Sequence, residues 1–70
     1  MLDKSDLTLR ELEIMSLFAQ GLTGLVIAQR LDISKRTVDT HVMNAKRKVG
    51  VKNVTELACY LLRHNLIQYN

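Results

Sequence analysis

The fold of this 70-residue chain is decided by residues 23–50, which read TGLVIAQRLDISKRTVDTHVMNAKRKVG. The stretch contains two segments with helical spacing of apolar residues, 24–31 and 35–48, separated by a short break. Ser34 stands before the second segment, where its hydroxyl suits a helix N-cap. That segment has one narrow apolar seam and is otherwise polar or basic; the seam consists of Val38, Val42, Ala45 and Val49. A short helix, a tight turn and a longer helix docked by one seam form a helix-turn-helix.

A further helix is predicted before this stretch, over residues 9–20. Thr8 and Glu11 have the spacing of a capping box, and Gly21 stands where a glycine commonly ends a helix. Glu11 falls on the buried stripe of this helix, so we expect it to serve the capping box and to pair with a basic residue such as Arg30. The stripe consists of Glu11, Ile14, Met15 and Phe18.

A last helix is predicted over residues 54–64, with Asn53 and Glu56 as its capping box. Its apolar run, residues 57–62, is far shorter than the roughly 20 residues that span a membrane. The run nevertheless wraps more than one face of the helix, which favours contact with a partner. The residues expected at a dimer interface are Cys59, Tyr60 and Leu61.

The size and composition of the chain exclude several classes of protein. Residues 1–70 are room for a single domain, which we predict to be all-α, a four-helix helix-turn-helix domain. The composition, 47% hydrophobic and 24% charged, is that of a globular chain. A single cysteine and no secretion signal favour a reduced, cytoplasmic protein. Because histidine, cysteine and carboxylate groups do not combine into a metal site or a catalytic constellation, we expect no enzyme activity and no cofactor.

Positive charge is concentrated between residues 34 and 53. This segment holds six basic residues and one acidic residue, Asp39, whereas the rest of the chain holds four basic and six acidic residues. Such a cluster is typical of a chain that binds a polyanion, with nucleic acid favoured over an anionic membrane, although a solvated basic face has the same composition.

Lys35 and Arg36 lie in a first helical turn, where the helix dipole disfavours a cation by roughly 0.3–1 kcal/mol. Two explanations remain: the two side chains contact a phosphate or a guanine, or Asp39 pairs with both of them and offsets this cost.

The face opposite the apolar seam of helix 35–48 is open to enter a DNA major groove. Its outward residues are Arg36, Thr40, Met43, Asn44 and Arg47, flanked by Lys35, Asp39 and Lys46. Lys46, Arg47, Lys48 and Lys52 lie at the far end or beyond it, within reach of phosphates. An aspartate in the groove can accept a hydrogen bond from a cytosine amino group, or it can hold the two neighbouring cations in place.

The chain resembles the LuxR-type DNA-binding domain, which includes the NarL, FixJ and GerE relatives. The resemblance runs from about Leu7 to Ile67 without a gap and is carried by LTLRELEIM (7–15), GLT (21–23), IA (27–28), IS (33–34), TV (37–38), HV (41–42) and KVGV (48–51). It implies a four-helix domain that binds duplex promoter DNA through its second and third helices, usually as a dimer joined by the last helix. By this resemblance, the phosphate contacts fall on Thr23, Thr37, His41 and Lys46, and the base contacts on Asp39, Thr40 and Met43.

Two departures from the family pattern are visible. The family often has Asn-Lys-Glu after the residue that caps the second helix, whereas residues 24–26 here read GLV. Val26 cannot complete a capping box with Thr23, and the two apolar side chains of this stretch are expected to be exposed. Asp39 and Met43 stand at positions where family members often have a basic or polar residue. The DNA sequence that this chain prefers therefore cannot be inferred from that of its relatives.

The sequence therefore predicts a bacterial transcription regulator that reads duplex promoter DNA through helix 35–48 as a dimer. RNA polymerase is the further partner expected of such a regulator, and no membrane association is expected. The alternative is an interaction protein that pairs with a related regulator through the last helix and titrates it. His41 keeps two interpretations, a phosphate contact or a ring packed between helices.

Overall fold

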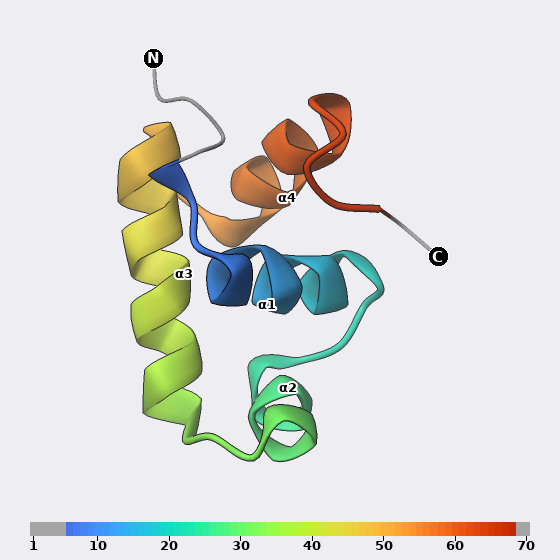
Figure 1. Ribbon diagram of the computed structural model, residues 1–70, viewed down its shortest axis with the longest axis vertical. Helices are drawn as coiled ribbons and strands as arrows, with labels where there is room; N and C mark the ends of the chain where they lie inside the picture. The colour runs from blue at the N-terminus through green and yellow to red at the C-terminus, as the bar shows by residue number, and fades with distance from the viewer. Residues whose placement is uncertain (1–5, 69–70) are drawn as a thin grey trace.

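The four predicted helices are all present in the computed structural model, which describes residues 6–68 (Figure 1). They are α1 (Leu9–Ala19), α2 (Gly24–Leu31), α3 (Lys35–Val49) and α4 (Val54–Arg63). The described residues contain no strand, so the prediction of an all-α fold is confirmed. Each predicted helix end lies within one residue of the observed end. Both ends of the single domain predicted over residues 1–70 lie outside the described residues.

Helix α3 is the longest helix and stands along one side of the molecule, with the other three helices stacked beside it (Figure 1). Helix α2 packs near the N-terminal end of α3, α4 near its C-terminal end, and α1 lies between them. This arrangement buries one side of α3 along its length and leaves the opposite side open. None of the helices in residues 6–68 combines the length and the hydropathy that a membrane span requires.

The hydrophobic core consists of two clusters, to which neighbouring residues of α1 contribute. Ile14 belongs to the cluster with α2 and α3, whose buried members are Ile14, Ile27, Ala28 and Val38. Met15 belongs to the cluster with α3 and α4, whose buried members are Leu7, Met15, Ala45, Leu57, Leu61 and Ile67. Phe18 and Val42 are partly buried and pack against both clusters. The predicted seam of α3 is confirmed, because it supplies side chains to both halves of the core.

Side-chain caps fix the starts of the first three helices. The Thr8 Oγ1 atom accepts a hydrogen bond from the Glu11 N–H at 3.0 Å, and the Glu11 carboxylate accepts one from the Thr8 N–H at 3.0 Å, so the predicted capping box is confirmed. Thr23 caps α2 by accepting from the Val26 N–H at 3.3 Å, with no reciprocal bond, as predicted. Ser34 caps α3 by accepting from the Thr37 N–H at 3.0 Å.

The cap of α4 is only half as predicted. The Asn53 side chain accepts a hydrogen bond from the Glu56 N–H at 2.8 Å, which is the expected half of a capping box. The Glu56 carboxylate, however, accepts from the Lys52 N–H at 3.1 Å rather than from the Asn53 N–H. Glu56 therefore ties the helix to the loop that precedes it, one residue further back than the motif predicts.

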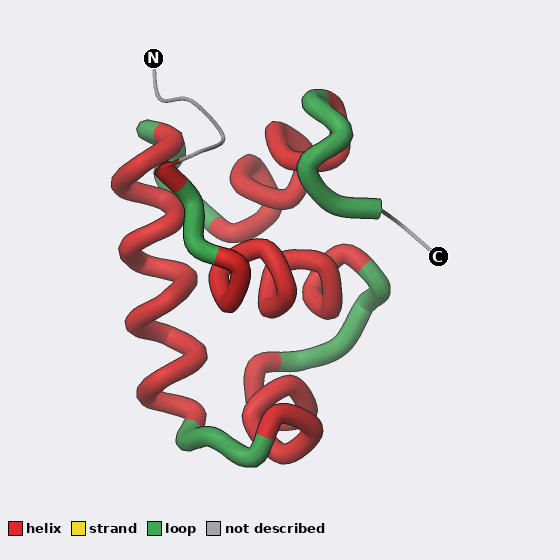
Figure 2. Tube along the Cα trace, viewed as in Figure 1, coloured by secondary structure: helices red, strands yellow, loops and turns green. Residues whose placement is uncertain are grey.

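The turn between α2 and α3 contains only residues 32–34 (Figure 2). Asp32 ends α2 with left-handed backbone angles, φ 58° and ψ 46°, which aspartate adopts more readily than most residues. The Ile33 N–H donates to the Ala28 carbonyl oxygen at 3.0 Å, so the chain turns back against α2 before Ser34 starts α3. This short, hydrogen-bonded turn fixes how α3 is presented relative to α2.

Candidate nucleic-acid interface

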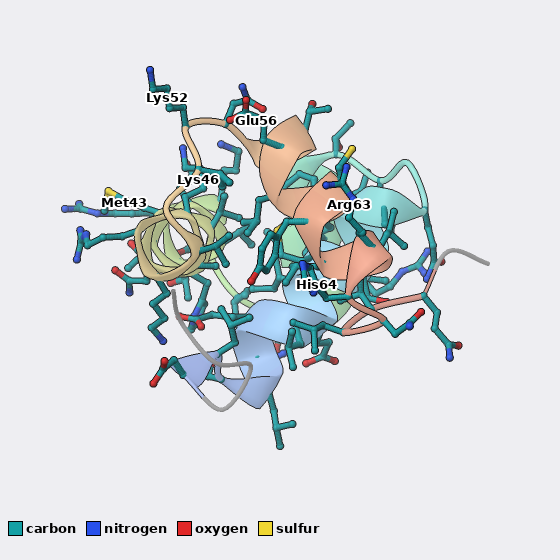
Figure 3. All side chains as sticks on the ribbon, turned by 90° about the horizontal axis from the view of Figure 1, so that it is seen from above. Met43, Lys46, Lys52, Glu56, Arg63 and His64 are labelled. Atoms are coloured by element: carbon teal, nitrogen blue, oxygen red, sulfur yellow. The ribbon has the colours of Figure 1, made fainter. Side chains whose placement is uncertain are left out.

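The exposed side chains of α3 form a stripe opposite its buried seam. We call this the outer stripe, and it consists of Arg36, Thr40, Met43 and Arg47. The steps of three or four residues keep these side chains on one face of a helix. Met43 is 50% exposed, and in a view from above it points away from the other helices (Figure 3). The buried seam thus docks α3, while the outer stripe stays in contact with solvent.

The predicted DNA-binding residues all lie on α3 except Thr23, the exposed N-cap of α2. Lys35 and Asp39 are exposed beside the outer stripe, and Thr37, His41, Asn44 and Lys46 are half-buried. The Thr40 hydroxyl donates to the Arg36 carbonyl oxygen at 3.0 Å. The structure therefore places most of the predicted site residues on one helix. The His41 side chain is half-buried, which agrees with either of its two interpretations.

An ion pair one helical turn long lies at the N-terminal end of α3. The Lys35 Nζ atom donates to both carboxylate oxygens of Asp39 at 2.9 Å. Within the described residues Arg36 makes no ion pair, so the alternative in which Asp39 pairs with both cations holds for Lys35 only. The penalty of the helix dipole on Lys35 is offset by this pair, whereas that on Arg36 is not.

A second ion pair anchors the C-terminal end of α3 to α1, and sequence reasoning missed it. The Lys48 Nζ atom donates to the two carboxylate oxygens of Glu11 at 3.0 and 3.1 Å. Glu11 is only 3% exposed. It pairs with a basic residue, as predicted, but that residue is Lys48 rather than Arg30, the example that the sequence suggested. In the part of the chain that the structure describes, the Lys48 ammonium group is therefore already paired with a carboxylate, unlike those of Lys46 and Lys52 in the same basic run. No local spacing could reveal a pair separated by 37 positions.

The remaining basic residues of the segment 34–53 make no ion pair within residues 6–68; they are Arg36, Lys46, Arg47 and Lys52. Figure 3 shows Lys46 on α3 and Lys52 in the connection to α4. The N-terminal half of the chain supplies no comparable excess of positive charge. The unpaired cations therefore lie on α3 and the loop that follows it, where they create a local positive potential.

The exposed surface of α4 differs from the prediction. Leu61 is fully buried in the core, so its predicted place at a dimer surface is wrong: its side chain is needed inside the molecule. Cys59 is exposed, and the half-buried Tyr60 ring lies 4.3 Å from the ring of His64. The large exposed apolar side chains of the described residues lie on the other three helices; they are Leu9, Leu25, Val26 and Met43. The exposure predicted for residues 25 and 26 is thus confirmed.

A shallow groove runs beside α4. It is bounded by the loop from Gly50 to Lys52 and by the outward face of α4, which contributes Glu56, Cys59 and Arg63. Side chains of both charges and an apolar strip of Cys59 and Tyr60 therefore meet along it. Figure 3 shows Lys52 and Glu56 at one end of this face and Arg63 further along α4.

A short helix, a fixed turn and a longer helix with a buried seam and an exposed, basic outer face define the helix-turn-helix class of DNA-binding domain. Residues 5–61 match the family model described as bacterial regulatory proteins of the luxR family, and the chain belongs to that family. The predicted LuxR-type identity, with its DNA-binding and transcription-regulating character, is thereby confirmed.

Curated relatives include the response regulator protein VraR of Staphylococcus aureus and of Staphylococcus epidermidis. Each is 44% identical over 62 residues, a match that covers 89% of this chain and 30% of the relative. The chain therefore spans less than a third of the length of these relatives. A solved structure of the transcription factor GerE superimposes with a TM-score of 0.87 at 33% sequence identity, covering 91% of this chain and 96% of that one.

Proposed function

We propose that this domain binds duplex promoter DNA in the bacterial cytoplasm, with α3 in the major groove, and thereby regulates transcription. The observation that carries the proposal is the outer stripe, which is exposed along α3 while the opposite seam is buried. The major groove of B-DNA, about 12 Å wide, admits one helix lengthwise. Unpaired cations on α3 and on the following loop support the same assignment, since phosphate contacts supply most of the affinity.

Within this interface we assign two kinds of contact. Thr23, Thr37, His41 and Lys46 contact phosphates and fix the position of α3 on the duplex. The other unpaired cations of α3 and its following loop also reach phosphates; they are Arg36, Arg47 and Lys52. Asp39, Thr40 and Met43 face base edges, where a carboxylate can accept from a cytosine amino group and an apolar group can contact a thymine methyl group. Because the Thr40 hydroxyl already donates to the Arg36 carbonyl, its methyl group and its lone pairs are what it can offer a base.

We further propose that two copies bind together through α4. In a two-fold interface the same surface meets itself, so groups of opposite charge on one copy face each other across the axis. The outward face of α4 fits this rule, because Glu56 and Arg63 flank an apolar strip of Cys59 and Tyr60. Helix-turn-helix dimers bind half-sites about 34–36 Å apart. A regulator bound at a promoter in this way would have RNA polymerase as its further partner.

The experiment that tests DNA binding is an NMR titration of the labelled domain with a duplex enriched from a randomised pool at low salt. Amide signals along the outer stripe of α3 should shift, whereas those around Leu9, the exposed first residue of α1, should stay unchanged. If no duplex binds, DNA binding is contradicted. A pull-down by a related full-length regulator would then support the alternative function of titrating that regulator.

Stoichiometry on a palindromic duplex tests the dimer separately. The wild-type domain should occupy the probe with two copies, and Cys59→Asp, which places a charge on the apolar strip, should weaken the binding of the second copy. Gln29→Ala, a change at an exposed position of α2, serves as the control. A wild-type stoichiometry of one copy per palindrome would contradict the dimer without affecting the assignment of α3.

A further inference from the structure

One of the three glycines is not explained by its backbone conformation. Gly21 and Gly50 have φ angles of 95° and 88°, a region that glycine adopts most readily. Gly24, the first residue of α2, has no such angle. Alanine could therefore adopt the same backbone conformation and would favour the helix more. What sets Gly24 apart is the space above it.

The side chain of Lys35 occupies that space. A Cβ atom at position 24 would lie 3.0 Å from Lys35 Cε and 3.3 Å from Lys35 Cδ, with Phe18 Cζ at 3.8 Å. The methylene stem of Lys35 on α3 thus lies directly over Gly24 on α2, and the end of the Phe18 ring on α1 borders the same space. Lysine commonly packs its stem on neighbouring surface in this way and leaves its ammonium group in water.

The position of this stem determines where the Lys35 ammonium group lies. It donates to both oxygens of Asp39 at 2.9 Å, although the two side chains are 48% and 59% exposed. An exposed pair of two mobile side chains contributes little, because ordering both of them offsets the attraction. When the stem is already seated on Gly24, less freedom is lost on pairing, so the Asp39 carboxylate is held in one orientation on the face of α3.

We propose that Gly24 determines the sequence specificity of the DNA interface indirectly. Its lack of a side chain lets the Lys35 stem lie over α2, and Lys35 in turn positions the carboxylate of Asp39. This inference rests on the proposed function, in which Asp39 faces a base edge. A carboxylate held in one orientation and partly neutralised by Lys35 can accept a hydrogen bond from one cytosine amino group. A carboxylate that rotates freely near phosphates is repelled by them and discriminates less between bases.

The test is Gly24→Ala. Its new methyl group lies too close to Lys35 Cε, so the flexible end of Lys35 must shift off its present position. The domain stays folded because alanine suits a helix. Without DNA, NMR relaxation should show a more mobile Lys35 ammonium group than in the wild type. In selection from randomised duplexes, discrimination at the base pair read by Asp39 should fall roughly five- to tenfold, with the other positions unchanged. Gln29→Ala, an exposed change on the same helix, should alter neither readout.

A double-mutant cycle shows whether Gly24 acts through Lys35. In a Lys35→Ala background, Gly24→Ala should leave the base preference unchanged, since the intermediary is already absent. The inference is overturned if Gly24→Ala keeps an ordered Lys35 and the wild-type preference, or if its effect persists fully in the Lys35→Ala background. If the wild-type domain selects no duplex, the proposed function fails, and this inference fails with it.

Discussion

The two ends of α3 carry the same chemical contact in opposite surroundings. At the N-terminal end, the Lys35 ammonium group binds both oxygens of Asp39 at 2.9 Å, and both side chains are about half exposed. At the C-terminal end, the Lys48 ammonium group binds both oxygens of Glu11 at 3.0 and 3.1 Å, and the carboxylate is buried. The first pair is local to one helix, whereas the second joins α3 to α1.

This difference separates the part of α3 that holds the fold from the part that can respond to a ligand. A buried carboxylate without its cation is strongly unfavourable, so the pair of Glu11 with Lys48 fixes the end of α3 in place. An exposed pair contributes little to stability, so its residues can be changed without unfolding the domain. The N-terminal end of α3 is therefore where DNA preference can change without loss of the fold.

The largest effect is expected from Lys48→Met. It keeps the stem of the side chain but leaves the Glu11 carboxylate buried without a cation, which should lower the free energy of unfolding by roughly 2–4 kcal/mol. Urea denaturation followed by circular dichroism measures the loss.

The charge explanation is checked by the double variant Glu11→Gln with Lys48→Met. It removes the unpaired charge and should recover part of the lost stability. If the double variant is less stable than Lys48→Met alone, burial of the charge is not the cause, and the contrast between the two ends of α3 is lost.

A smaller effect is expected from Asp39→Ala, and on specificity rather than on the fold. Discrimination at one base pair should fall by roughly 1–3 kcal/mol, since one hydrogen bond to a base is lost. Non-specific affinity should rise, because a negative charge near the phosphates is removed. Selection from randomised duplexes with both proteins measures this; identical preferences with a uniform change in affinity would rule out base reading by Asp39.

The smallest effect is expected from Lys35→Ala on stability. Since the pair that it breaks is exposed, the free energy of unfolding should change by less than about 0.5 kcal/mol. The measurement is the same urea denaturation, run beside Lys48→Met. A loss as large as that of Lys48→Met would mean that both ends of α3 are structural.

The features that sequence reasoning predicted correctly are those that depend on local spacing. The capping box of Thr8 with Glu11, the caps at Thr23 and Ser34, and the seam of α3 each follow from residues within a few positions of one another. The pair of Lys35 with Asp39 is of the same kind, because four positions make one helical turn. Local rules therefore place the helices and the outer face of α3.

Apart from the half-formed capping box of α4, which is local, the features that were predicted wrongly depend on tertiary contacts. Glu11 pairs with Lys48 rather than with Arg30, and only the packing of α1 against α3 decides this. Leu61 points into the core rather than to a partner, because the orientation of a helix whose apolar residues wrap more than one face is set by its neighbours. The role of Gly24 likewise appears only when α2 and α3 lie side by side. Which DNA sequence α3 prefers depends on such contacts as well.

The salt dependence of duplex affinity tests the central claim most directly, which is that the unpaired cations of α3 and its following loop bind phosphates. Four of them per copy should give a slope of log K against log salt near −4 for one copy, or near −7 for two, by an estimate of about 0.9 per phosphate. Lys46→Ala should flatten the slope by about one unit and weaken all sequences alike. A wild-type slope near zero would contradict DNA binding by this surface.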